Sequence, residues 1–117
     1  MEQIIFLGTA SAISNANQEN SHLFVESGNL KILVDCPGNP ISRLLKAKVD
    51  PLQLTDLVIT HFHPDHVSGL PLLLMDLWLM GRKTTINIYG LEFTLDHAEA
   101  LMDLKKSKST AKIQKGC

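Results

Sequence analysis

Near the middle of the 117-residue sequence, four potential metal ligands fall within six residues: His61, His63, Asp65 and His66. They follow an apolar, β-branched segment that predicts a strand. In an extended chain, residues two apart point to the same side, so His61 and His63 can direct their imidazoles at one ion. Pro64 disfavours a helical conformation at His63 and helps to keep this geometry.

Asp65 and His66 come where the expected strand turns into a helix, so these two successive side chains can reach a second ion about 3.5–4 Å from the first. Nitrogen and carboxylate ligands suit Zn²⁺ best, with Mn²⁺ or Fe²⁺ as alternatives. Two such ions activate water for hydrolysis, and Asp65 can orient or deprotonate that water. A histidine-rich surface loop formed by chance is disfavoured, because the spacing is directional.

The elements around this segment predict a layered α/β fold and not an all-β barrel. Strands are expected at residues 3–7, 21–26, 30–35, 56–60 and 84–89, helices at 40–48, 68–80 and 94–106, and a capped turn at 50–54. The turn-rich residues 27–29 predict a β-hairpin. Asn39 is expected to cap a helix, Gly81 to end the next one, and Gly90 to end a strand.

Composition indicates one small globular domain, with 44% hydrophobic and 20% charged residues. The net charge of −1 argues against a dedicated nucleic-acid binder. The charge is uneven, because residues 1–104 hold six Lys/Arg and all twelve acids, whereas 105–117 hold five lysines. We expect a domain over residues 1–104 and a basic tail over 105–117, a linker or frayed end. Its lysines are expected to be solvated, with attraction of an RNA backbone as the alternative.

The cysteines and the first residues indicate a reducing compartment. Cys36 and Cys117 lie far apart, and the N-terminal residues 1–3 lack the basic start of a secretory signal. The most apolar stretch, residues 67–80, is interrupted by polar residues and is shorter than the roughly 20 residues that a membrane span needs. We expect a soluble, cytoplasmic protein.

The motif and its surroundings resemble the metallo-β-lactamase superfamily. The run from His61 to His66 is similar to the superfamily's signature, and other stretches are similar to its ribonuclease Z-like branch. These stretches are residues 6–12, 34–36 and 69–71, and Arg82-Lys83 through Ile88-Tyr89-Gly90. The similarity spans residues 3–104. It implies the N-terminal half of an αββα sandwich, in which a mixed sheet is flanked by helices.

The resemblance also implies two zinc ions and phosphodiester cleavage, with arylsulfatase-like and other ester hydrolases as relatives. His61 and His63 would bind the first metal. Asp65 and His66 would bind the second, with Asp65 also accepting the proton. A complete member adds a histidine, a bridging aspartate and a last histidine from its later sequence.

No residue of this sequence corresponds well to any of these three later ligands. His97 follows the motif too soon to be the next ligand, and His22 lies in an expected strand and is expected to be structural. Two ligands per ion fall short of the three or four of tight zinc sites, so we expect weak metal binding. The sheet would expose an apolar face for a missing C-terminal half, a partner chain or self-association. A fragment, a truncated reading frame or half of a split enzyme explains both shortages.

Four other features have alternative interpretations. Asp35 either orients a ligand histidine or caps its own turn, and these two roles stay open. Gly8-Thr9 is expected to form a turn, with a position at the rim of the active site as the less favoured alternative. Cys36 is expected to be a buried apolar group, because no basic neighbour activates it. The helix over residues 70–80 is apolar nearly all round, so its outer face with Trp78 is hypothesised to form a homodimer.

The leading hypothesis is a metal-dependent hydrolase that is a phosphodiesterase, a ribonuclease Z-like endonuclease acting on RNA precursors. A second keeps the metals and changes the substrate to a sulfate ester, a lactam or a thioester. A third treats the chain as a non-catalytic half-domain for assembly or metal binding.

Overall fold

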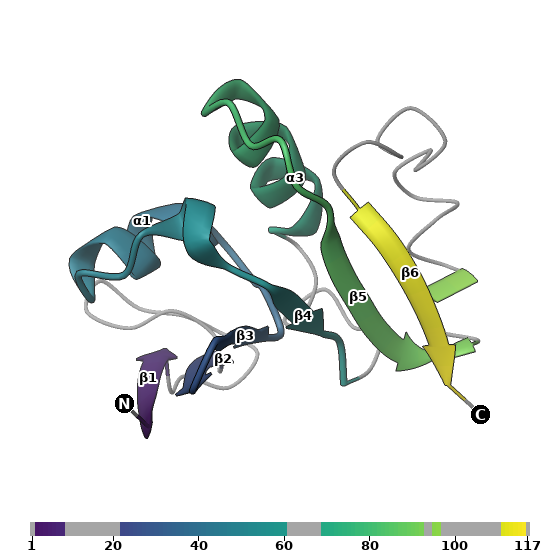
Figure 1. Ribbon diagram of the computed structural model, residues 1–117, viewed down its shortest axis with the longest axis horizontal. Helices are drawn as coiled ribbons and strands as arrows, with labels where there is room; N and C mark the ends of the chain where they lie inside the picture. The colour runs from purple at the N-terminus through teal and green to yellow at the C-terminus, as the bar shows by residue number, and fades with distance from the viewer. Residues whose placement is uncertain (1, 9–21, 61–68, 93–94, 97–110, 117) are drawn as a thin grey trace.

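A single six-stranded sheet organises the chain in the computed structural model, which describes residues 2–8, 22–60, 69–92, 95–96 and, by their backbone, 111–116. Its strands lie side by side in sequence order (Figure 1). They are β1 (Glu2–Gly8), β2 (His22–Ser27), β3 (Leu30–Val34), β4 (Asp56–Val58), β5 (Ile86–Leu91) and β6 (Ala111–Gly116). The first three strands are antiparallel and β3 to β6 are parallel, so the expected mixed sheet is confirmed.

Among the described residues, the sheet is accompanied by α1 (Pro40–Lys46), the 3₁₀ turn η1 (Pro51–Gln53) and α3 (Leu70–Leu79). The Asn39 side chain accepts a hydrogen bond from the Ser42 amide at 3.2 Å, so the expected cap is confirmed. Gly81 ends α3 with a φ of 89°, also as expected. Among the described helices, none is long and apolar enough to cross a membrane.

The core lies between the helices and one face of the sheet. Phe24, Leu33, Leu57 and Ile88 are aligned across β2 to β5, and each is at most 1% exposed. Burying each side chain contributes about 1.5–3 kcal/mol. The helices add further fully buried leucines: Leu44 of α1 and Leu70, Leu73 and Leu77 of α3.

The opposite face of the sheet is apolar and not covered by α1 or α3. Ile4 pairs with Val25, and Phe6 pairs with Leu23. Ile4 is 63% and Phe6 is 68% exposed. The expected exposed apolar face is therefore observed among the described residues.

The C-terminal part of the sheet differs from expectation at two points. Gly90 lies inside β5 and does not end it. A Cβ on Gly90 would lie 3.0 Å from the Ile59 carbonyl oxygen and 3.1 Å from a Leu95 methyl carbon, so glycine permits close packing there. Within the expected linker or frayed end, residues 111–116 form β6, because they pair in parallel with β5.

Some expected segments fall outside the described residues. Of the helix expected over residues 94–106, only Leu95 and Asp96 are described, and both are helical. The loop expected over residues 10–20 is not among the described ranges.

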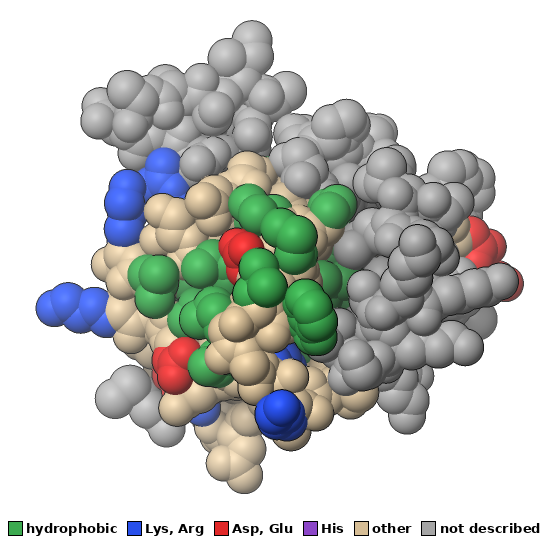
Figure 2. All heavy atoms as spheres, turned by 90° about the horizontal axis from the view of Figure 1, so that it is seen from above, with side chains coloured by type: hydrophobic (Ala, Val, Ile, Leu, Met, Phe, Trp, Pro, Cys, Tyr) green, Lys and Arg blue, Asp and Glu red, His purple; other side chains and the backbone are tan. Residues whose placement is uncertain are grey.

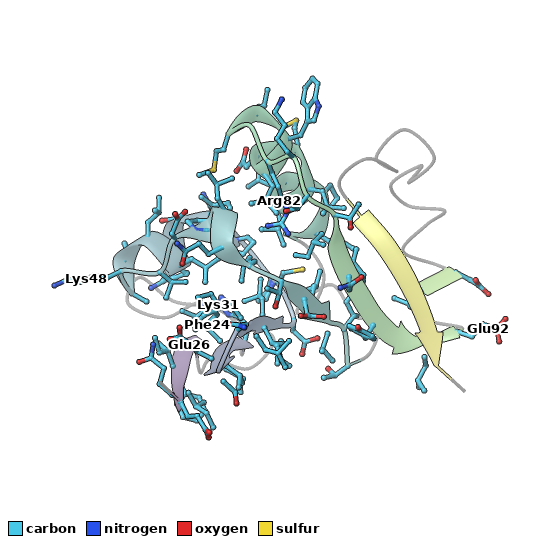
Figure 3. The ribbon with its side chains drawn as sticks, viewed as in Figure 1. Phe24, Glu26, Lys31, Lys48, Arg82 and Glu92 are labelled. Atoms are coloured by element: carbon cyan, nitrogen blue, oxygen red, sulfur yellow. The ribbon has the colours of Figure 1, made fainter. Side chains whose placement is uncertain are left out.

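Arg82 links the connection between α3 and β5 to η1 by a hydrogen bond, and Figure 3 shows its position. Its Nε donates to the Thr84 carbonyl at 2.8 Å, and its Nη atoms donate to the carbonyls of Leu52 and Thr85 at 3.1 Å each. The side chain is buried, and this burial lowers the pKa of the guanidinium. Arg82 therefore stabilises the turn from which β5 begins.

Arg82→Met is expected to lower the free energy of unfolding by about 3 kcal/mol, because three carbonyls lose a charged donor. Chemical denaturation followed by circular dichroism measures the change. Lys83→Met is the matched control, since Lys83 is exposed, and its effect should stay within about 0.5 kcal/mol. Equal stabilities of the two variants would contradict this role for Arg82.

Candidate functional site

The four candidate ligands, His61, His63, Asp65 and His66, lie in residues 61–68, outside the described part of the chain. The structure does describe the two residues that flank this segment, Thr60 and Gly69. Hydrogen bonds fix both of these flanking residues, Thr60 to Asp35 and Gly69 to Cys36.

Thr60, the last described residue before the segment, lies at one edge of the sheet. Strands β3, β4 and β5 are parallel, so their carboxyl ends meet at this edge, where open α/β sheets bind ligands. Because β1 and β2 are antiparallel to their neighbours, the same edge receives Gly8 and its partner His22. The topology thus brings Gly8, His22, Asp35 and Thr60 to one edge.

Asp35 connects the end of β3 to the end of β4. Its carboxylate accepts hydrogen bonds from the Thr60 backbone N–H and from the Thr60 hydroxyl, both at 2.8 Å. Its own N–H donates to the Val58 carbonyl at 2.7 Å. Asp35 is 5% exposed and has a φ of 62°, a left-handed conformation in which Asp is enriched.

These contacts favour a role for Asp35 in positioning Thr60 over a role in capping its own turn. The carboxylate binds the residue that directly precedes His61, so it acts on the start of the motif. Sequence reasoning did not identify Thr60. The available signal was a hydroxyl-bearing, β-branched residue between a buried strand and the first histidine.

Gly69 holds the other end of the segment against the connection between β3 and α1. Its N–H donates to the Cys36 carbonyl at 2.7 Å. A Cβ at this position would lie 2.6 Å from the carbonyl oxygens of Cys36 and Gly38 and 2.6 Å from Cδ of Pro40. Only glycine therefore fits without a shift of the backbone.

Cys36 is fully buried, as expected for an apolar group. Burial raises the pKa of its thiol well above the ordinary range, and the neighbouring charge of Asp35 adds to the effect. The thiol therefore stays protonated, which is unsuited to a nucleophile or a metal ligand.

The two other histidines and the first turn complete the sequence-predicted candidates. His22 is 3% exposed within β2, consistent with a structural role. Gly8 ends β1 at an irregularity in the register with β2. Thr9 and His97 lie outside the described residues.

The candidate metal donors all belong to the motif segment. Within the described ranges, no three His, Cys, Asp or Glu side chains form a group that could hold a metal ion. The donors of residues 61–66, three imidazoles and one carboxylate, are chemically suited to Zn²⁺. Their sequence position places them directly after the carboxyl end of β4.

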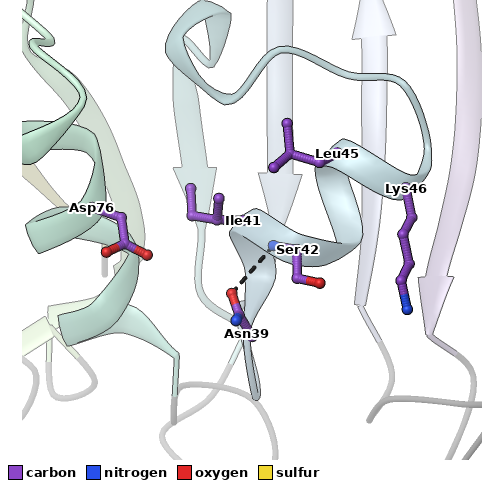
Figure 4. A pocket seen from close by; sticks show the side chains of 6 residues that line it. All are labelled: Asn39, Ile41, Ser42, Leu45, Lys46 and Asp76. Atoms are coloured by element: carbon purple, nitrogen blue, oxygen red, sulfur yellow. Dashed lines mark hydrogen bonds between the residues drawn. The ribbon is translucent and has the colours of Figure 1, made fainter.

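A separate groove of about 490 Å³ lies between α1 and α3 (Figure 4). It is lined by Asn39, Ile41, Ser42, Leu45, Lys46 and Asp76. None of these residues belongs to the contacts that hold Thr60 and Gly69.

Comparison with known proteins relates the chain to metallo-β-lactamase fold proteins. Residues 2–101 match the family described as Anti-Pycsar protein Apyc1. Ribonuclease Z from Methanosarcina mazei is 33% identical over 99 residues, which are 85% of this chain and 32% of that protein. Ribonuclease Z from Methanocaldococcus jannaschii is 32% identical over 102 residues, which are 87% of this chain and 32% of that protein.

Solved structures agree with this relation. The short form of human tRNase Z matches with a TM-score of 0.81 and 27% identity, over 98% of this chain and 44% of that one. The metallo-β-lactamase fold protein YhfI from Bacillus subtilis matches with a TM-score of 0.78 and 23% identity, over 97% of this chain and 46% of that one. The expected fold class is therefore confirmed. The chain spans about a third of the length of the curated relatives that it matches.

Proposed function

The chain belongs to the Anti-Pycsar protein Apyc1 family, in the ribonuclease Z-like branch of the metallo-β-lactamase superfamily, and we propose that it forms the N-terminal part of a metal-dependent phosphodiesterase. One observation carries the proposal. Strand β4 ends at the carboxyl edge of the parallel strands, and Thr60, held there by Asp35, is followed directly by His61. The relatives named ribonuclease Z and tRNase Z support RNA as the phosphodiester.

Each motif residue has a proposed role. His61 and His63 would hold one divalent ion, and Asp65 and His66 the second, with Zn²⁺ favoured over Mn²⁺ or Fe²⁺ by the donor set. When bound, the ions lower the pKa of a water and stabilise developing negative charge. Asp65 would orient that water and accept its proton.

The rest of a longer protein is proposed to complete this site. The motif supplies two ligands per ion, fewer than a tight zinc site has. The apolar sheet face with Ile4 and Phe6 lies opposite the helices, where a second sheet would pack in an αββα sandwich. The curated relatives are about three times as long as the matched region, which is consistent with a further half that supplies both ligands and cover.

Zinc content and turnover of bis-p-nitrophenyl phosphate test this proposal. The chain is assayed alone and mixed with the part of Methanosarcina mazei ribonuclease Z that follows the matched region. We expect weak zinc binding and no turnover for the chain alone, and turnover in the mixture. His63→Ala should abolish this turnover, whereas His97→Ala, the control, should retain it.

Two results would contradict the proposal in different ways. Stoichiometric zinc with full activity in the monomeric chain would refute the need for further ligands. Zinc binding without turnover of phosphodiesters in the mixture would instead favour a sulfate ester, lactam or thioester substrate, or a non-catalytic half-domain.

A homodimer through α3 is part of the proposal. Exposed apolar side chains occur on α3, at its C-cap and on α1, and Trp78 is 62% exposed. They are Met75, Trp78 and Leu79 of α3, Met80 at its C-cap, and Leu45 of α1. Figure 2 shows hydrophobic side chains gathered on this face around an acidic one. Exposed apolar patches with a charged group beside them are typical of interaction surfaces.

The charges beside this surface fit a second copy of the chain. Lys46 of α1 and Asp76 of α3 line the same groove. In a two-fold dimer, residue i of one copy meets residue j of the other and vice versa, so Lys46 and Asp76 can pair twice.

Trp78→Glu is expected to convert the dimer to a monomer in sedimentation equilibrium, because each copy would bury a new charge. Lys48→Glu is the control, since it changes an exposed charge outside the patch, and it should stay dimeric. A monomeric wild-type chain, or an unchanged mass for Trp78→Glu, would end the dimer proposal.

The organisation and location of the chain complete the proposal. We retain a domain over residues 1–104 and a basic tail over 105–117, with β6 of the tail paired to the sheet. The lysines of the tail remain candidates for contact with an RNA backbone. A cytoplasmic location rests on the two widely separated cysteines.

A further inference from the structure

The turn after β3 fastens both ends of the motif segment, and we infer that Thr60 and Gly69 are positioning residues through which this turn sets the geometry of the metal ligands. The turn comprises residues 35–38 and is called the clamp turn below. The inference rests on the proposed function, because it assigns no ligand beyond those of the motif.

The first attachment joins Thr60 to Asp35. Two hydrogen bonds of 2.8 Å, from the backbone N–H and from the side-chain hydroxyl, reach the two oxygens of one carboxylate. Bonds to an ionised acceptor are about twice as strong as neutral ones. A bidentate contact also fixes the orientation of Thr60, the last described residue before His61.

The second attachment joins Gly69 to the next residue of the same turn. The Gly69 N–H donates to the Cys36 carbonyl at 2.7 Å. The carbonyls of Cys36 and Gly38 and the ring of Pro40 surround the position of a side chain, each 2.6 Å from where a Cβ would lie. Gly69, the first described residue after the segment, is therefore held at the clamp turn by steric contact as well as by a hydrogen bond.

Adjacent residues, Asp35 and Cys36, thus hold the two ends of residues 61–68. The clamp turn is itself fixed to the sheet, because the Asp35 N–H donates to Val58. A segment with both ends fixed loses less conformational entropy when its side chains converge on ions, so its affinity for metal is higher. Loss of either attachment should weaken metal binding even though no ligand is changed.

The chain contains a matched control for Thr60. Thr55 lies just before β4, as Thr60 lies after it, and its hydroxyl also bonds to β3. It accepts from the Lys31 N–H at 2.9 Å and donates to the Lys31 carbonyl at 3.2 Å. Thr55 therefore has a similar structural role at the opposite edge of the sheet, away from the motif.

Zinc affinity of the full chain, measured by competition with a chelating dye, tests the first attachment. We expect Thr60→Val to weaken zinc binding by about 10–100-fold, as loss of a partner outside the ligand shell commonly does. Thr60→Ser keeps the hydroxyl and should restore the affinity, and Thr55→Val should leave it unchanged. The visible absorption of bound Co²⁺ should change for Thr60→Val but not for Thr55→Val.

Amide hydrogen exchange without metal tests the second attachment. Gly69→Ala should speed exchange at the Thr60 and Gly69 amides. Gly81→Ala introduces backbone strain at a φ of 89° and should leave these amides protected.

The outcomes separate this inference from the proposed function. Wild-type zinc affinity and Co²⁺ absorption in folded Thr60→Val, or unchanged protection in folded Gly69→Ala, would overturn the inference. A wild-type chain that binds neither ion would refute the metal site itself and the inference with it.

Discussion

The carboxylate of Asp35, buried at the end of β3 and bonded twice to Thr60, is the contact on which the proposed site depends. Strand β4 has only three residues, so its own pairing fixes it over a short length. Asp35 extends the attachment beyond the strand, to the last residue before the motif. Together with the Ile59 N–H, which donates to the Tyr89 carbonyl at 2.9 Å, it holds the chain where it leaves the sheet at the carboxyl edge.

The two faces of the sheet explain why the chain resembles the first half of a larger domain. One face is filled by Phe24, Leu33 and Leu57 against α1 and α3. The other carries exposed side chains, Ile4 and Phe6 among them, that favour burial. The chain matches only about a third of the length of its curated relatives. This partial length is consistent with a sheet that is covered on one face and open on the other.

Local signals predicted most of the fold. The Gly28-Asn29 turn, the Asn39 cap and the motif after a buried strand each depend on neighbouring residues, so they can be recognised in sequence. The sequence does not predict why positions 69 and 90 require glycine. The carbonyl oxygens that leave no room for a side chain at Gly69 and Gly90 come from residues distant in the chain. Strand β6 was not predicted, because residues 111–116 contain one large apolar residue, Ile113, and alternate apolar and polar residues only over 111–114. Asp35 was recognised, but its partner Thr60 became evident only from the pairing of β3 with β4.

The central claim is that residues 61–66 bind divalent metal from the carboxyl edge of the sheet. Nuclear magnetic resonance of the five histidine side chains during titration with Zn²⁺ tests it most directly. The account predicts that the imidazole signals of His61, His63 and His66 shift together while those of His22 and His97 stay in place. Shifts confined to His22 or His97, or no shift at all, would contradict it.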